Sequence, residues 1–503
     1  MNPLLGSPSS KTIACQKTCV ANILNHVLEF DRQAAHSTLY TAIFRAPEDP
    51  ALLYKSDNIM NETNRSIEDT ITVLQDAIDR AVKLGASAAE AALSTGGGLS
   101  VTVRNGELES IEHHEDKALS LSTYRGKSKG TATTTDFSTQ SIEDTVVAAD
   151  RIAQLAEPDP YAGLIDSKYL AQEIPDLDLD HPWGLEPESA VELAKRCDTA
   201  AREFGPGVKQ IDDVSVAQHR GLRGYASSDG FAHAYLGSRH SLSCVVVGKS
   251  GGVMQRGHWY TVARDANELE APELVGTTAA KRTVAKLGAR KIRTQKAPVI
   301  FEAPIAEGLI GHFVNAVSGG NLYRKASFLV DSVDQTIFPE HISIIERPHI
   351  PRGLGSSPFD AEGAKTSDRT LVENGVLTGY VLGSYSARRL NLEPTGNAGG
   401  VNNLTVKHQP LGFDELVKQM DCGLIVTDLM GFGINLVTGD YSRGASGFWV
   451  ENGEAAYPVE EITIAGNLTD MFKHIVACAD DVDLRGNIRC GSILLESLTI
   501  AGS

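Results

Sequence analysis

Asn105 and Gly106 stand between two segments in which apolar and polar residues alternate, LSVTVR before them and ELESIEHHE after them. A period of two is typical of strands that bury one face. Both central residues of a type I′ turn have positive φ, and Asn-Gly adopts that conformation at low cost. The segments AAEAALS upstream and ALSLSTYRGKSKGTATT downstream continue the alternation. The sequence therefore predicts consecutive strands of a curled antiparallel sheet.

Helical periodicity occurs on both sides of these strands. Residues 66–85 open with Ser66, a capping residue, and acids follow in the first turn. A second helix is predicted near 139–156, and residues 157–186, rich in proline and aspartate, form an irregular connector. The apolar stripe predicted for the first helix consists of Ile71, Leu74, Ile78, Ala81 and Val82.

A further helix is predicted near 187–204, followed by strands to about residue 262. Another helix within 268–296 ends in a basic stretch that has no acid between Glu273 and Glu302. Cations at a helix C-terminus complement the helix dipole, so we expect this helix to lead into a linker. A nucleic-acid patch is the alternative. The cations are Lys281, Arg282, Lys286, Arg290, Lys291, Arg293 and Lys296.

The length of 503 residues exceeds what one core of ordinary size accommodates. Residues 1–59 are predicted to be an N-terminal extension that the folded body does not need and that can be disordered. Residues 60–290 are predicted to form an N-terminal domain of helices and a curled antiparallel sheet. Residues 291–503 are predicted to form a mostly antiparallel, β-rich domain. The predicted fold class is α+β.

The predicted C-terminal domain opens with the strand APVIFEA and a helix that contains EGLIGH, residues 307–312. Two later segments, LVENGVLTGYV and WVENGEAAYPV, each place Asn-Gly between apolar runs and predict hairpins with the same turn chemistry. Ile305, Leu309, Phe313 and Val317 recur every four residues and predict the buried stripe of the helix.

The EGLIGH helix offers the pair of residue types that metal sites use, Glu307 and His312. In a straight α-helix these positions are about 140° apart, so they cannot share one metal ion. A π-bulge, which Gly308 and Gly311 would ease, would bring them closer together. Without the bulge we expect a solvated Glu307 and a His312 that lies near the buried stripe, in the core or in an interface.

Other motifs carry less chemistry. His113 and His114 are adjacent in a strand and point to opposite faces. SLSC, residues 241–244, lacks companions for a nucleophile, and the sequence contains no GxSxG motif, Walker loop or GxGxxG between a strand and a helix. No catalytic residue and no residue that binds an organic cofactor is predicted from these patterns.

The net charge of −18 repels phosphate backbones, so nucleic acid is not an expected partner. No apolar run approaches the ~20 residues that span a bilayer, so no membrane partner is expected. Seven scattered cysteines suit a reducing compartment better than a disulfide framework. A cytoplasmic location is expected.

Several long stretches identify a family. They are HSLSCVV (240–246), SGGNLYRKASFLVDS (318–332), SPFDAEGAKT (357–366), LGSYSARRL (382–390), TGDYSRGASGFWVENGE (438–454), EITIAGNLTDMF (461–472) and NIRCGSILL (487–495). From about residue 60 onward the chain resembles the TldD/PmbA family, also called modulators of DNA gyrase, and within it the PmbA/TldE subgroup. Residues 1–59 lie outside the resemblance.

The resemblance implies a zinc metallopeptidase made of two related subunits, TldD and TldE. The TldD helix reads HExxxH, and a cysteine near the C-terminus is a further zinc ligand. By family position His312 matches the second histidine, Glu307 replaces the first, Gly308 replaces the catalytic glutamate, and Cys490 falls in the region of the cysteine. Glycine accepts no proton, so the resemblance implies a degenerate site, with Glu307, His312 and Cys490 as the metal candidates.

We therefore expect a subunit of a TldD–TldE-type zinc metallopeptidase that processes peptides. Zinc and enzymatic activity are expected to depend on a TldD-like partner, and the substrates are expected to be unfolded or small peptides. Two alternatives stay open: a non-enzymatic regulator of the gyrase-modulator type, and a standalone metallopeptidase with an atypical site.

Overall fold

The structure, a computed structural model, describes residues 66–502. Helix α3 (Ile67–Lys83) begins after Ser66, whose Oγ accepts a hydrogen bond from the Asp69 N–H at 3.0 Å. The prediction for Val82 is wrong, because its side chain is 46% exposed. Val82 lies about 100° around the helix from Ala81, beyond the buried arc. That arc comprises Thr70, Leu74, Ala77, Ile78 and Ala81. The predicted extension, residues 1–59, lies outside the described residues.

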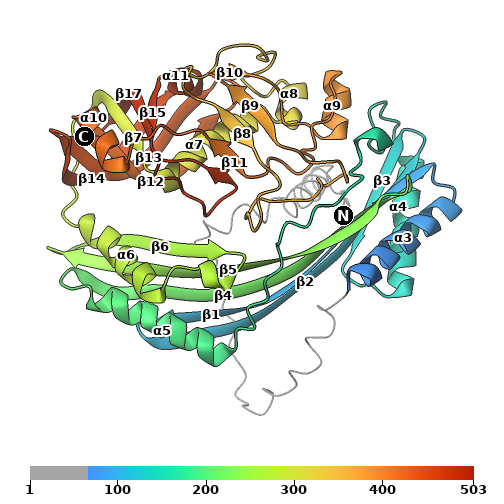
Figure 1. The fold of residues 1–503 in the computed structure, drawn as a ribbon, viewed down its shortest axis with the longest axis horizontal. Coiled ribbons are helices and arrows are strands. Elements are labelled where there is room, and N and C mark those ends of the chain that lie inside the picture. Colours follow the sequence, from blue (N-terminus) through green and yellow to red (C-terminus); the bar gives the residue numbers. More distant parts are fainter. Residues whose placement is uncertain (1–65, 503) are drawn as a thin grey trace, which may run out of the picture. The chain divides into compact units, whose positions relative to one another are not determined.

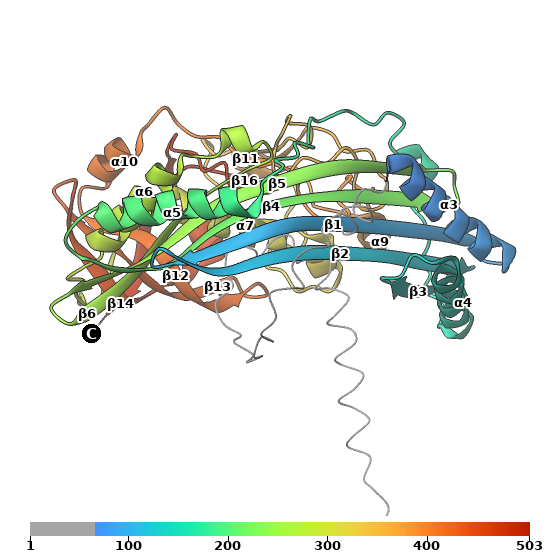
Figure 2. The ribbon, with the colours of Figure 1, turned by 90° about the horizontal axis from the view of Figure 1, so that it is seen from below.

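The first sheet has six antiparallel strands in the order β3-β2-β1-β4-β5-β6. Figures 1 and 2 show β1, β2, β4 and β5 running side by side along a curved sheet. Asn105 (φ 51°) and Gly106 (φ 82°) form the predicted turn between β1 and β2. The strands are β1 (Ala88–Arg104), β2 (Glu107–Arg125), β3 (Ser128–Thr134), β4 (Val208–Ser227), β5 (Ala232–Ser250) and β6 (Val253–Ala263).

Strands β1 and β2 are longer than predicted. AAEAALS and LSVTVR belong to one strand that continues through TGGG, and ELESIEHHE and ALSLSTYR belong to one strand that continues through DK. The glycines let β4 approach closely. A Cβ on Gly98 would collide with the backbone carbonyl of Gln218, and one on Gly96 would meet the His219 ring. The glycine-rich composition of TGGG is typical of a loop, but these residues belong to β1 and lie directly against β4. His113 and His114 lie in β2, where both are exposed.

Helices cover one face of this sheet. Helices α3 and α4 (Thr139–Leu155) pack on Ala91, Leu119 and Leu222, whereas α5 (Pro187–Glu203) and α6 (Pro272–Ala285) pack toward its other end. Figure 2 places the two helix pairs at opposite ends. The opposite face of the sheet holds Tyr225, which packs with Phe359 and Ala364 of the C-terminal half. The remaining short helices of this half are η2 (Ser167–Tyr169) and η3 (Ala266–Glu268).

The C-terminal half contains a closed ring of strands. The second six-stranded sheet has the order β14-β13-β12-β7-β17-β15, and an additional pairing joins β14 to β17. Thr463 of β14 pairs with Ala501, and Ile493 of β17 pairs with Phe301 of β7. The strands are β7 (Gln295–Phe301), β12 (Gly423–Asn435), β13 (Asp440–Glu451), β14 (Glu454–Asn467), β15 (Ile475–Cys478) and β17 (Ile493–Ala501).

A smaller five-stranded sheet has the order β10-β9-β8-β11-β16, with a parallel pairing between β11 and β16. Its strands are β8 (Ile344–Glu346), β9 (Arg369–Glu373), β10 (Val376–Leu377), β11 (Leu404–Val406) and β16 (Ile488–Arg489). The helices of this half are α7 (Ala303–Ala316), α8 (Gly319–Tyr323), α9 (Ser384–Leu390), α10 (Phe413–Met420) and α11 (Leu468–Lys473). Helices and mostly antiparallel sheets confirm the α+β class, while the boundary at residues 290/291 stays a prediction.

The Asn-Gly hairpins of the C-terminal half are also confirmed. Asn374 (φ 48°) and Gly375 (φ 83°) join β9 to β10, and Asn452 (φ 55°) and Gly453 (φ 74°) join β13 to β14. The two pairs share their turn chemistry and lie in different sheets.

The basic stretch that begins in the last turn of α6 pairs with the C-terminal half. Arg282 contacts both carboxylate oxygens of Glu302 at 2.7 Å, and Lys286 lies 2.8 Å from Asp428. The Arg290 guanidinium lies 3.4 Å from the centroid of the Tyr457 ring. Several of these cations therefore tie α6 to the strands that follow it, which is a structural use that the linker prediction missed.

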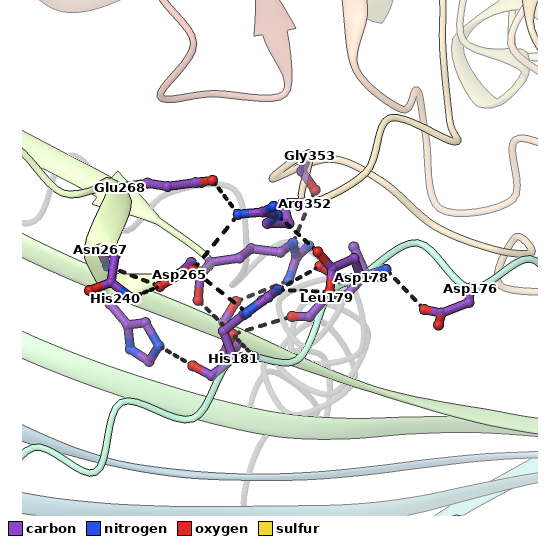
Figure 3. Close-up of polar contacts among 12 residues, drawn as sticks. Asp176, Asp178, Leu179, His181, His240, Asp265, Asn267, Glu268, Arg352 and Gly353 are labelled. Carbon is purple, nitrogen blue, oxygen red and sulfur yellow. Dashed lines mark hydrogen bonds and ion pairs between the residues drawn. The ribbon is translucent and has the colours of Figure 1, made fainter.

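A second set of contacts ties the connector to both halves (Figure 3). Arg352 lies 2.9 Å from Asp178 and 2.7 Å from Glu268. The imidazole of His181 lies 3.1 Å from Asp178. The backbone C=O of His181 lies within hydrogen-bond distance of His240 Nε2, at 2.8 Å. Contacts at Asp178 and His181 thus fix the connector, although its composition predicts an irregular segment.

Candidate functional site

Helix α7 is the element that carries two of the three metal candidates. It begins after Glu302, and the Ala303 N–H donates to Ser492 Oγ at 3.0 Å. The predicted stripe is correct at Leu309, Phe313 and Val317, which are buried, while Ile305 is partly buried against the same core. The helix also buries Ala306, Ile310 and Val314. It therefore lies inside the C-terminal half, and only part of its surface can serve a site.

Glu307 faces the segment between β15 and β16. Its carboxylate lies so close to Gly486 that a Cβ there would collide with it. Burial, and then the negative charge of Asp483, raise the pKa of Glu307 to about 7, and Arg485 partly offsets this. The expectation of a solvated Glu307 is therefore wrong. The helix sits deeper than a single apolar stripe suggests, and the loop from β15 to β16 covers this carboxylate.

His312 faces strand β13. Its ring packs edge-on against Tyr441, with centroids 5.9 Å apart. Burial, and then the positive charge of Arg443, lower the pKa of His312 to about 4, so its imidazole is neutral near pH 7. The predicted place beside the buried stripe is correct.

Cys490 is fully buried at the end of β16. Burial, and then Cys478, raise the pKa of its thiol well above its usual range. Its backbone C=O accepts a hydrogen bond from the Asp483 N–H at 3.1 Å. The loop from β15 to β16 therefore lies next to both Glu307 and Cys490, whereas His312 packs on β13.

The three candidates, as placed, do not fit a zinc ion. Zinc takes about four ligands in a tetrahedron and binds thiolate and carboxylate in their deprotonated forms. The raised pKa values of Glu307 and Cys490 disfavour the deprotonated forms that zinc binds, and the Arg443 charge beside His312 opposes a cation. Within residues 66–502, no three His, Cys, Asp or Glu side chains form a group that could hold a metal. At position 308 an added Cβ would meet open space.

Sequence reasoning missed the residues that set these environments. Arg443 lies two residues after Tyr441 on β13, and its buried Nε has no hydrogen-bond partner among the described residues. Asp483 and Arg485 pair with each other at 2.6 Å, and Arg485 also donates to the Tyr260 C=O. The only sequence signal for Arg443 was its place in TGDYSRGASGFWVENGE, one of the stretches that carry the family resemblance.

Models of three consecutive family domains match the chain. They are described as PmbA/TldA metallopeptidase domain 1, which matches residues 89–153, the central domain, which matches 180–287, and the C-terminal domain, which matches 294–502. The C-terminal match includes Glu307, His312 and Cys490.

Curated relatives match over nearly their whole length. Metalloprotease PmbA of Escherichia coli O157:H7 is 45% identical over 439 residues, which cover 87% of this chain and 98% of the relative. The PmbA homologue of Haemophilus influenzae is 46% identical over 428 residues, which cover 85% of this chain and 95% of the relative.

Solved structures share the fold. A Bacteroides thetaiotaomicron protein called a modulator of DNA gyrase superposes with a TM-score of 0.82 at 25% identity, covering 87% of this chain and 100% of the other. TldE from Thermococcus kodakarensis superposes with a TM-score of 0.75 at 21% identity, covering 86% and 100%, a likeness that concerns the fold alone.

Proposed function

The chain belongs to the PmbA/TldD metallopeptidase family. We propose that it is the TldE-type subunit of a two-subunit peptidase, without a complete zinc site of its own. The zinc and the catalytic glutamate would lie in a TldD-like partner. The observation that carries the proposal is the helix α7. It presents Glu307 and His312 to different neighbours and has glycine at position 308.

The chemistry of a zinc peptidase supports this division of labour. A metal-bound water becomes nucleophilic near neutral pH, and a carboxylate beside it accepts the proton. Gly308 offers no acceptor, and the neutral imidazole of His312 lies under the repulsive field of Arg443. The role proposed for this chain is therefore to bind and orient peptides for the partner, in the cytoplasm.

Peptide binding finds support in the sheets. An extended peptide can add a strand to an exposed sheet edge through backbone hydrogen bonds. In the five-stranded sheet β16 is an edge strand, and its Ile488 side chain lies against α7 near Gly311. A peptide paired at this edge would lie close to the helix that carries the metal candidates. No helix of the described residues is long and apolar enough to cross a membrane.

Purification with and without a partner tests the proposal. The chain alone should hold well under one zinc per molecule and cleave no peptide. Mixed with the TldD homologue of the same organism, it should form a stoichiometric complex that contains zinc and cleaves unfolded peptides. About one tightly held zinc in the chain alone, lost in His312→Ala or Cys490→Ala, would contradict the proposal.

A standalone peptidase is the second candidate, and one observation favours it. Glu307 has a pKa of about 7, a value suited to a general base near neutral pH. Activity of the chain alone that disappears in Glu307→Gln would support this candidate. Activity that appears only in the complex and survives Glu307→Gln would support the two-subunit proposal.

A further inference from the structure

Two arginines on one face of the five-stranded sheet, Arg347 and Arg489, have no carboxylate partner within residues 66–502. Thr405 of β11 pairs with Arg489 of β16 on one side and with Ile345 of β8 on the other. Side chains directly opposite one another in a sheet share a face, and residues two apart on one strand share it as well. Arg347 follows β8 two residues after Ile345, so it lies on the same face as Arg489.

The opposite face of the same sheet shows how the chain treats a buried arginine. Glu346, which is 2% exposed, pairs with Arg369 at 2.8 Å. Glu346 also accepts hydrogen bonds from Asn397 Nδ2 and the Asn402 N–H. The charge of Arg369 is thus compensated by Glu346, although its buried Nη2 has no hydrogen-bond partner within residues 66–502.

Within residues 66–502, Arg489 has no carboxylate that compensates its charge. Its Nε is buried and has no hydrogen-bond acceptor among the described residues. Its charged neighbour in this part of the chain is Arg347, and burial together with this like charge lowers the pKa of Arg489. A buried donor without an acceptor destabilises the fold, and so do two neighbouring cations without an anion. An anion bound between them would relieve both costs.

The backbone around the two arginines is held in place by side chains. Asn403 Nδ2 donates to the Arg347 C=O at 2.9 Å. The Asn403 N–H donates to Asn487 Oδ1 at 2.6 Å, and Asn487 lies two residues before Arg489. These bonds fix the segments that carry both guanidinium groups, which favours a preformed binding site.

From this geometry we propose that Arg347 and Arg489 bind the carboxylate of a peptide. Guanidinium groups match the planar carboxylate with paired hydrogen bonds. A single carboxylate also suits a protein with a net charge of −18 better than a polyanion does. That the carboxylate belongs to a peptide rests on the proposed function, and the site lies on the edge strand where a peptide could pair.

Titration with matched peptides tests this site. The probes are an N-acetylated alanine tripeptide with a free C-terminal carboxylate, its C-terminal amide, and an amide peptide that contains one glutamate. Binding is measured calorimetrically at low salt, with the chain alone and with its complex. The free acid should bind at least tenfold more tightly than the amide. Comparable binding of the glutamate peptide would support the site and assign the carboxylate to a side chain.

Matched variants locate the site. Arg489→Gln and Arg347→Gln should each weaken binding of the free acid at least tenfold, while Lys407→Gln, an exposed cation just after β11, should leave it unchanged. Arg347 is exposed, so its variant keeps the test valid if Arg489→Gln fails to fold. Equal binding of acid and amide, unchanged binding in both arginine variants, or binding of inorganic phosphate without either carboxylate peptide would overturn the inference.

The two proposals fail in different ways. If the complex cleaves peptides while the arginine variants bind the free acid normally, the carboxylate site is wrong and the proposed function stands. If the carboxylate binds as expected and the complex cleaves nothing, the binding site stands and the peptidase role is wrong.

Discussion

Glu307 and His312 lie five residues apart on one helix, yet they face different surroundings. The carboxylate of Glu307 faces Asp483, and the imidazole of His312 faces Arg443. Each group is partly buried next to a charge of the sign that it would itself carry, so the charged form of each is disfavoured. A metal centre requires the opposite arrangement, in which several ligands face one point and their charges offset that of the ion. A helix can therefore keep the residue types of a metal site when their side chains no longer face one point.

The largest expected effect concerns catalysis in the complex. If neither face of α7 serves the chemical step, His312→Ala should leave the rate at saturating peptide nearly unchanged. Removing the catalytic glutamate of the TldD-like partner should lower that rate on the order of 10²–10⁴-fold, because the proton acceptor is lost. Both rates are measured on preformed complexes. Loss of turnover in His312→Ala with an intact partner would show that His312 takes part in the chemical step.

The Glu307 face should show itself in the pH dependence of stability. The pKa of the Glu307 carboxyl is raised from 4.5 to about 7. Between these pH values the folded protein therefore holds a proton that the unfolded chain has released. Stability is therefore lost as the pH rises from about 4.5 to 7. Glu307→Gln should be more stable than the parent at pH 8 by up to about 3 kcal/mol, and this advantage should vanish near pH 4.

Denaturant unfolding at several pH values measures this difference. Glu340→Gln, an exposed control, should show no such pH-dependent gain. If Glu307→Gln changed the free energy of unfolding equally at pH 4 and pH 8, the pKa of Glu307 would not be raised in the folded protein.

The His312 face should show the opposite trend. Its pKa is lowered from 6.5 to about 4, so the unfolded chain takes up a proton that the folded protein refuses. Stability is lost as the pH falls from about 6.5 toward 4. His312→Gln lacks this loss, and relative to the parent it should gain about 2 kcal/mol between pH 7 and pH 4.5. The exposed His113→Gln is the control, and a flat difference for His312→Gln would refute the assignment.

The smallest effect concerns the glycine between the two faces. Gly308 lies inside a helix, and an added Cβ would meet nothing within 4 Å. Gly308→Ala should therefore stabilise the protein by about 0.5–1 kcal/mol, since alanine loses less backbone entropy. Gly276→Ala in α6 is the matched contrast, because its Cβ would collide with the Cys197 C=O. A melting temperature lowered by Gly308→Ala would indicate a close neighbour at this position.

The sequence predicted what depends on local rules. Asn105-Gly106, Asn374-Gly375 and Asn452-Gly453 all form the turns that their chemistry requires, and α7 begins and buries its stripe as expected. The continuity of β1 through its glycines was missed, because only the neighbouring strand β4 explains them. The surroundings of Glu307 and His312 were missed for a related reason. Asp483 and Arg443 are more than 100 residues away in sequence, and spacing along the chain does not encode which side chain faces which.

The ring of strands in the C-terminal half has a consequence for how the chain is made. Strand β7 pairs with β12 on one side and with β17 on the other, and β17 ends at Ala501. A ribosome releases β7 long before β17. During synthesis one edge of β7 therefore stays unpaired until almost two hundred further residues have been added. Loops of this length close slowly, and unpaired strand edges attract other chains. Nascent chains stalled before residue 493 should therefore bind chaperones and resist proteases poorly, and release of the last strand should end both behaviours together.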